Sequence, residues 1–156
     1  VYSNDYESIR PAIPEDAYSI FNITRNAVRT DALLERTKDY VDAEISNFLV
    51  YEIDGSIIGC IHLQKYDDGK VIEVGSVYVL PFYQKKGVGR RMVEYVCHES
   101  PNDGAERIFA LTTQATKFFT TVCRFKEGSY DDLPEERARE AEANGRNSRV
   151  FYLDLS

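Results

Sequence analysis

A basic, glycine-containing run at positions 84–91, Gln84-Lys-Lys-Gly-Val-Gly-Arg-Arg, has residue types that suit an anionic ligand. Gly87 and Gly89 let neighbouring backbone amides converge without obstruction by a Cβ. An amphipathic helical pattern follows at once, with Met92 and Val96 spaced four residues apart. First-turn amides have no partner inside their helix, and the helix dipole is positive at that end. The segment therefore predicts a phosphate-binding nest.

Glu73 is the carboxylate of an otherwise apolar, β-branched run, residues 71–80. A carboxylate placed in such a strand is a candidate general base, because burial tunes its proton affinity for transfer near neutral pH. The alternative is a solvated glutamate that faces the edge of the strand. Proton transfer would best be relayed through a water molecule.

Strand and helix signals alternate along the chain in the order βααβββαβαβ, which predicts one mixed α/β domain over residues 1–156. Asp54-Gly55 is the sharpest of these signals, because both residues accept the positive φ angles of a tight hairpin. We expect strands at 8–12, 48–53, 56–64, 71–80, 107–111 and 148–155, and helices at 14–29, from 37, after the basic loop and at 115–122, with a turn and the start of a helix within 131–137.

The composition is that of a folded protein, with 43% hydrophobic and 29% charged residues among 156. A net charge of −7 argues against binding to nucleic acid or to an anionic membrane. Cys60, Cys97 and Cys123 form no metal-type pair, so we expect no metal site and reduced, buried thiols in the cytoplasm. The first residue is Val1, so we expect that the chain is cut from a longer polypeptide.

The basic loop resembles the Q/R-x-x-G-x-G/A motif of the GNAT acetyltransferases, with Gln84, Gly87 and Gly89 at its fixed positions. A glycine turn with a solvated basic rim is the alternative. The resemblance implies a GNAT fold, classed as α/β (α+β). It has a mixed, mostly antiparallel sheet with splayed middle strands and helices on both faces. It also implies acetyl-CoA as co-substrate, with no metal.

By the same resemblance, the cofactor is bound through the strand end and the loop. The implied contacts are Val77, Tyr78, Val79, Gln84, Lys85, Lys86, Gly87, Val88, Gly89 and Arg90. Glu73 takes the role of catalytic base. Many GNAT enzymes protonate the leaving thiolate with a tyrosine, but none lies between Leu111 and Ser129, which leaves Thr112, Ser76 or solvent as the acid.

A narrower resemblance links the chain to the acetyltransferase domains of N-acetylglutamate synthases. Four segments carry it: Leu34-Glu-Arg-Thr-Lys, Glu73 to Ser76, Leu111-Thr-Thr, and Leu133-Pro-Glu-Glu-Arg followed by Arg146-Asn-Ser-Arg. It implies L-glutamate as acceptor, with Leu34, Arg36, Arg137, Arg146 and Ser148 as substrate ligands. Permanently charged, planar guanidinium groups suit a dicarboxylate, which supports these residue types.

The segment 117–125 departs from the family pattern, because it is one residue longer and has Cys123-Arg124 where a Gly-Phe corner is usual. Two other functions stay open: a GNAT enzyme for another small amine, and a non-catalytic module that senses CoA. A homo-oligomer or a separate regulatory domain is also left open. We interpret His62 and His98 as structural residues.

Overall fold

The computed structural model describes residues 2–3, 6–28 and 36–155, which form two compact units. The first unit consists of residues 1–63 and 76–95, and the second of residues 64–75 and 96–156. The helices and strands are β1 (Tyr2–Ser3), β2 (Glu7–Pro11), α1 (Ala17–Val28), α2 (Lys38–Ala43), β3 (Phe48–Ile53), β4 (Ser56–Tyr66), β5 (Val71–Val79), α3 (Val88–Glu99), β6 (Arg107–Thr112), β7 (Lys126–Gly128), α4 (Glu135–Ala143) and β8 (Arg149–Asp154).

The first unit is built on an antiparallel run of strands in the order β1-β2-β3-β4. Asp54 and Gly55 join β3 to β4 with φ angles of 50° and 80°. These angles confirm the hairpin predicted from the sequence, since both central residues of this type of turn need a positive φ.

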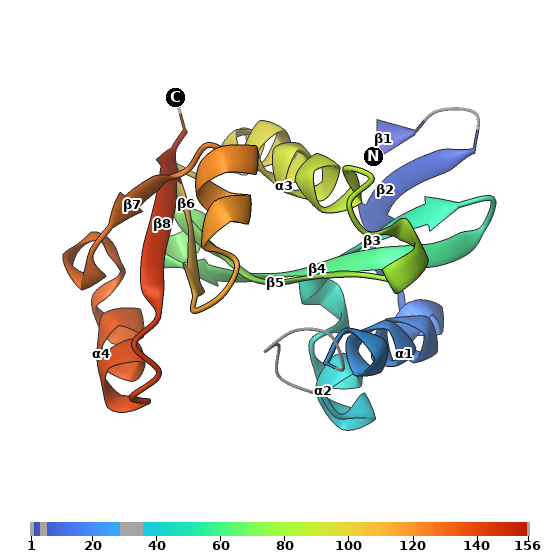
Figure 1. The fold of residues 1–156 in the computed structure, drawn as a ribbon, viewed down its shortest axis with the longest axis horizontal. Coiled ribbons are helices and arrows are strands. Elements are labelled where there is room, and N and C mark those ends of the chain that lie inside the picture. The colour runs from blue at the N-terminus through green and yellow to red at the C-terminus, as the bar shows by residue number, and fades with distance from the viewer. Residues whose placement is uncertain (1, 4–5, 29–35, 156) are drawn as a thin grey trace. The chain divides into compact units, whose positions relative to one another are not determined.

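Helices cover both faces of the first unit's strands. Figure 1 shows α1 and α2 on one face of β3 and β4 and the start of α3 on the other. Thr37 caps α2 as predicted, because its side chain accepts a hydrogen bond from the amide of Tyr40 at 3.0 Å. A Cβ on Gly59 of β4 would lie 3.1 Å from the carbonyl oxygen of Tyr78 and 3.2 Å from Met92 of α3. Glycine at this position therefore allows β5 and α3 to pack close to β4.

The second unit has strands in the order β5-β6-β8-β7, with a parallel β5–β6 pair and antiparallel pairs beyond it. The β5–β6 pairing ends at Glu73 and Phe109, although β5 continues to Val79 and β6 to Thr112.

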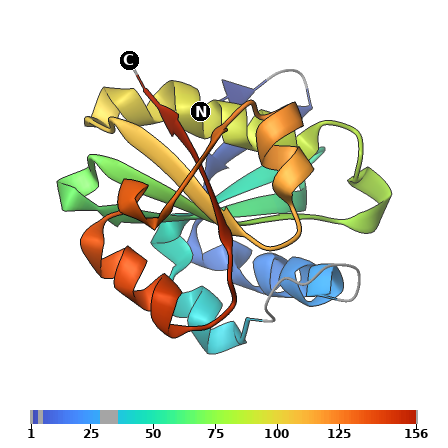
Figure 2. The ribbon, with the colours of Figure 1, turned by 60° about the vertical axis from the view of Figure 1, so that its left-hand side comes forward.

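Alternation along β8 sends successive side chains to opposite faces of the second unit. Val150 packs with Phe109 and with Ala138 of α4, whereas Phe151 stacks on Phe119 at 6.4 Å between ring centroids. Figure 2 shows α4 and the short helical segment around Phe119 on different sides of β8.

Three expectations from the sequence need correction. Residues 118–122 form a π-helical turn in place of the α-helix predicted at 115–122, and Cys123 donates its amide proton to the carbonyl of Phe118, five residues back, at 2.9 Å. A π-turn takes up one extra residue, which accounts for the longer segment. Of the cysteines only Cys60 is buried, and Cys97 and Cys123 are partly exposed. The short strand β7 was not predicted.

Candidate functional sites

The basic loop in the first unit presents main-chain donors at the start of α3. The first helical hydrogen bond there runs from the amide of Arg91 to the carbonyl of Gly87, at 3.0 Å. The amides of residues 88–90 precede it and make no main-chain hydrogen bond within the described parts of the chain. Positive φ angles of 61° at Lys85 and 84° at Gly87 turn the backbone into the helix. This arrangement of donors is the geometry that an anion nest requires, and anion binding by the loop stays a prediction.

Two side-chain contacts hold this loop in place. Gln84 donates from Nε2 to the carbonyl oxygen of Val79 at 3.0 Å, which ties the loop to the end of β5. Arg91 donates from Nε to the hydroxyl of Tyr51, a buried residue of β3, at 2.9 Å. A Cβ on Gly87 would come within 3.0 Å of Nη1 of Arg91. Arg91 therefore anchors the loop and does not act as a loose surface cation.

The other loop cations lie at its rim. Lys86 places Nζ 4.1 Å from the ring centroid of Phe82, and the Nε atom of Arg90 lies 3.5 Å from Glu94. Of the predicted cofactor contacts at the end of β5, Val77 and Val79 are partly exposed and Tyr78 is buried. The rim thus offers positive charge next to the main-chain donors.

Glu73 lies in the second unit as part of a hydrogen-bonded cluster with Arg137 and Tyr66. Arg137 of α4 donates from Nε to Oε1 at 2.8 Å and from Nη2 to Oε2 at 3.2 Å, and the Tyr66 hydroxyl donates to Oε1 at 3.3 Å. Glu73 is 7% exposed. Burial lowers the pKa of Arg137, but the hydrogen bond and charge of Glu73 outweigh it, so the net shift is upward. Burial, followed by the charge of Glu73, raises the pKa of Tyr66.

This cluster changes the roles expected from the sequence. The sequence predicted a general base tuned by burial, but the two oxygens of Glu73 are also held by a forked guanidinium. Among the described residues Oε2 accepts only from Arg137, so it keeps a lone pair that can accept a proton from an amine or a water. Arg137, predicted as a substrate ligand, is occupied by Glu73. Tyr66 was missed, although it directly precedes the predicted turn at Asp67.

The hydroxyl residues predicted as the acid or as a substrate ligand, Thr112, Ser76 and Ser148, lie in different environments. Thr112 accepts hydrogen bonds from the amides of Gln114 at 3.2 Å and Ala115 at 2.9 Å, so its hydroxyl caps the turn after β6. Its own proton is still available to donate. Ser76 is buried, at 9% exposure. Ser148 is partly exposed, and its carbonyl accepts from the Tyr130 hydroxyl at 3.3 Å.

The predicted guanidinium ligands Arg36 and Arg146 are both accessible. Arg146 is exposed in the loop before β8, and its amide donates to the side chain of Asn144 at 2.9 Å. Arg36 lies in the first unit just before α2, with its guanidinium 4.6 Å from the ring centroid of Tyr40. Leu34 lies outside the described residues. Of the predicted catalytic and substrate ligands, the structure joins only Glu73 and Arg137 by direct contact within the described residues.

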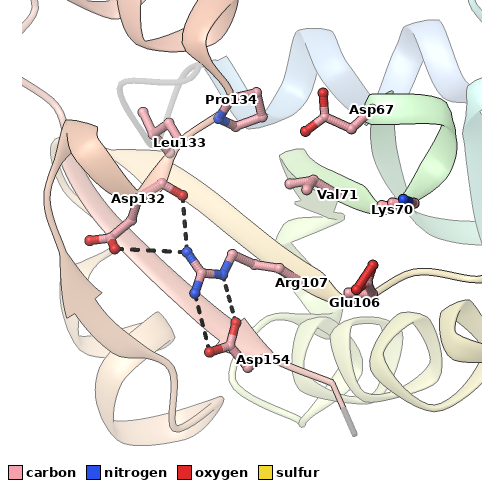
Figure 3. Close-up of a pocket in the computed structure, with 9 residues that line it drawn as sticks. All are labelled: Asp67, Lys70, Val71, Glu106, Arg107, Asp132, Leu133, Pro134 and Asp154. Carbon is pink, nitrogen blue, oxygen red and sulfur yellow. Dashed lines mark hydrogen bonds and ion pairs between the residues drawn. The ribbon is translucent and has the colours of Figure 1, made fainter.

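A cavity of about 440 Å³ lies in the second unit at the start of β5 and β6, and Figure 3 shows its lining side chains. Arg107 donates to both oxygens of Asp154, at 2.6 and 3.2 Å, and to the carbonyl of Asp132 at 3.2 Å. The hydrogen bond from Arg107 lowers the pKa of Asp154. The cavity contains none of the predicted site residues, and its ion pairs link β6 to β8.

Residues 14–125 match the sequence profile of the Acetyltransferase (GNAT) family, which covers both the basic loop and the strand that carries Glu73. This chain belongs to the GNAT acetyltransferase family. No helix within the described residues of this GNAT chain has the length and apolar character to cross a membrane.

Curated relatives of this GNAT chain include amino-acid acetyltransferases. The protein from Neisseria meningitidis is 32% identical over 150 residues, and the alignment covers 96% of this chain and 34% of that protein. The protein from Actinobacillus pleuropneumoniae shows the same identity, with 96% of this chain and 34% of that protein covered. The chain therefore spans about a third of the length of these relatives.

Solved structures extend the similarity to the fold. N-acetylglutamate synthase from Neisseria gonorrhoeae, complexed with coenzyme A and N-acetyl-glutamate, matches with a TM-score of 0.88 at 30% identity, over 99% of this chain and 36% of that one. Rv2747 from Mycobacterium tuberculosis matches with a TM-score of 0.75 at 19% identity, over 96% of this chain and 99% of that one. The predicted GNAT fold is confirmed.

Proposed function

We propose that residues 1–156 act as one N-acetyltransferase domain that transfers the acetyl group of acetyl-CoA to the α-amine of L-glutamate. The observation that carries this proposal is the loop at the start of α3, whose main-chain amides precede the first helical hydrogen bond. Such donors suit the diphosphate of coenzyme A. The relatives named amino-acid acetyltransferase, and the gonococcal synthase complexed with coenzyme A and N-acetyl-glutamate, support the donor and the acceptor.

In the proposed reaction the neutral amine of glutamate attacks the thioester carbonyl carbon, and the carbon–sulfur bond then breaks. Glu73 accepts the amine proton at Oε2, directly or through one water, because Oε1 already has two donors. The thiolate takes a proton from Thr112, Ser76 or solvent. Arg137 serves as a positioning residue, since its forked contact fixes the orientation of the carboxylate.

The acceptor side of the proposal rests on Arg36 and Arg146. Arg146 is exposed and Arg36 is partly exposed, and a dicarboxylate amine offers a carboxylate to each. Arg137 is not among the proposed glutamate ligands, because its guanidinium already binds the carboxylate of Glu73. Selection of glutamate over amines without two carboxylates is the expected consequence.

A thiol-release assay across a panel of amines tests this function. We expect turnover with L-glutamate that exceeds turnover with L-glutamine, spermidine and a peptide amine. Turnover with spermidine or the peptide and none with glutamate would contradict the acceptor while leaving the acetyltransferase activity in place. Mass spectrometry of the product distinguishes acetylation of the amine from hydrolysis of the thioester.

One observation favours a second function, a CoA-binding module without turnover. Glu73 is already paired with Arg137, and a base held in an ion pair is less free to accept a proton. Such a module would bind coenzyme A through the loop and release no thiol with any amine in the panel. Calorimetric titration with coenzyme A, run beside the thiol assay, separates the two functions.

A further inference from the structure

The guanidinium of Arg36 contacts an aromatic ring, while its N–H groups have no partner among the described residues. Its Cζ lies over the ring of Tyr40, 4.6 Å from the ring centroid, within the range of a cation–π contact. Within the described residues its N–H groups have no recorded hydrogen bond or close ion pair. A cation–π contact uses the face of the guanidinium and leaves the N–H groups at its edge available. An edge with paired N–H donors is the geometry that binds a carboxylate.

Tyr40 is itself held in place by a buried histidine of β4. Nε2 of His62 lies 2.9 Å from Oε1 of Glu44 and 3.4 Å from the Tyr40 hydroxyl, so a proton on Nε2 is shared between these two acceptors. His62 is 8% exposed, and its ring packs edge-on against Phe48 at 5.0 Å between centroids. These contacts restrict the position of the imidazole. Because the imidazole contacts the Tyr40 hydroxyl, they restrict the position of Tyr40 as well.

Glu44 completes the network at the other end of α2. Its Oε1 also accepts from Nδ2 of Asn47 at 3.3 Å. The hydrogen bond from His62 lowers the pKa of Glu44 against the effect of burial, with smaller contributions from Asn47 and from the charges of His62 and Arg36. An ionised Glu44 and a buried His62 thus fix α2 relative to β4, and Tyr40 extends from this fixed helix toward Arg36.

We infer that Tyr40 is a specificity-determining positioning residue, which holds Arg36 by its face so that the guanidinium edge receives a carboxylate of the amine acceptor. His62 and Glu44 restrain Tyr40 in this role. The inference rests on the proposed acceptor function and deepens it, since it names the device that makes one carboxylate site rigid. Orienting a guanidinium in advance reduces the rotamer entropy lost when the substrate binds.

Substitution of the aromatic ring tests the inference. In Tyr40→Leu we expect the KM for L-glutamate to rise about three- to tenfold, with kcat and the KM for acetyl-CoA within twofold of wild type. Tyr40→Phe keeps the ring, so its KM should lie closer to wild type than to the leucine variant. Calorimetric binding of glutamate to the CoA-saturated enzyme should weaken by the same factor, which gives a readout independent of turnover.

Tyr18→Leu is a matched control. Tyr18 is 67% exposed, and Nζ of Lys38 in α2 lies 5.5 Å from its ring centroid, so the variant also removes a cation–π contact beside this helix. Glutamate binding should not change in it. An equal loss in Tyr18→Leu and Tyr40→Leu would show that the effect is a general one on α2 and would overturn the inference.

A double-mutant cycle shows whether Tyr40 acts through Arg36. In an Arg36→Ala background, Tyr40→Leu should cause no further loss of glutamate binding, and an undiminished loss would contradict the inference. Arg36→Lys, which lacks the forked edge, supplies the same test should the leucine variant fold poorly. A wild type that uses glutamate together with an unaffected Tyr40→Leu variant refutes this inference alone. A wild type that acetylates only amines without a carboxylate refutes the proposed function as well.

Discussion

The loop at the start of α3 and the cluster around Glu73 handle charge in opposite ways. The loop exposes main-chain donors from consecutive residues, 88–90, that precede the first hydrogen bond of their helix. The cluster joins side chains far apart in the sequence, Tyr66, Glu73 and Arg137, and these groups already bond to one another. The loop thus offers main-chain donors to a ligand, whereas the donors and acceptors of the cluster are already paired with one another.

Removal of the Glu73 charge should give the largest effect of all. In Glu73→Gln we expect kcat to fall about 100-fold or more, the usual size of a lost general base, with coenzyme A affinity within twofold of wild type. Steady-state kinetics and calorimetry measure the two quantities. Glu140→Gln is the matched control, because Glu140 also approaches Arg137, at 3.7 Å, but is 70% exposed. Unchanged turnover in Glu73→Gln would assign the cluster to structure alone.

A substitution in the loop should lower the affinity for coenzyme A, the quantity that Glu73→Gln leaves unchanged. In Gly87→Ala the new Cβ meets Arg91 at 3.0 Å and the backbone is strained at φ 84°. We expect coenzyme A affinity to fall about tenfold, close to the loss of one charge-assisted hydrogen bond. Gly55→Ala has a similar φ of 80° with nothing within 4 Å, so it shares the strain without touching the nest. Equal coenzyme A affinity in the two variants would argue against the nest.

Breaking the Glu73 ion pair should destabilise the second unit. Arg137→Ala leaves a buried carboxylate without its guanidinium, and we expect the free energy of unfolding to fall by about 2–4 kcal/mol. Adding Glu73→Gln to this variant should restore part of the loss, since the orphaned charge is then removed. Urea denaturation measures both changes. Arg139→Ala, whose partner Glu135 is exposed, should cost less than about 0.5 kcal/mol. Equal losses in Arg137→Ala and Arg139→Ala would contradict the buried pair.

The smallest effect is expected at Tyr66, and its sign depends on pH. At neutral pH Tyr66→Phe should lose about 1 kcal/mol of stability with the hydrogen bond to Glu73. Burial and the charge of Glu73 raise the pKa of Tyr66 in the folded protein, so above the unfolded pKa of about 10 only the unfolded chain ionises there. Wild-type stability should therefore fall relative to the variant by up to about 1.4 kcal/mol per pH unit above pH 10.

Urea denaturation at pH 8, 10 and 11 should show the stability of the wild type falling toward that of Tyr66→Phe as the pH rises. Tyr18→Phe, at a residue that is 67% exposed, should run parallel to wild type throughout. Parallel curves for Tyr66→Phe as well would mean that the hydroxyl is not buried against Glu73.

The sequence predicts what depends on neighbours in the chain. The Asp54-Gly55 turn and the Thr37 cap each act over a few residues, and the structure confirms both. At the basic loop the positive φ of 84° suits glycine at position 87, while anion binding there stays a prediction. The net negative charge of the protein does not affect the prediction for this loop, because the donors of the loop are main-chain groups.

The sequence does not predict contacts that depend on distant parts of the chain. Glu73 and Arg137 are 64 residues apart, so nothing in either local pattern indicates that they pair. Tyr66 looks like any aromatic residue at a strand end. In the sequence, the only sign of the π-turn at 118–122 is that segment 117–125 is one residue longer than the family pattern. The sequence does not specify where the backbone takes up such an insertion.

The claim that the loop's main-chain amides bind diphosphate can be tested directly by nitrogen-15 amide shifts during a titration with coenzyme A. We expect the amides of Val88, Gly89 and Arg90 to shift strongly and to saturate together, while acetyl-pantetheine, which lacks the diphosphate, leaves them in place. Coenzyme A that binds without moving these three amides, or equal shifts with acetyl-pantetheine, would contradict the account.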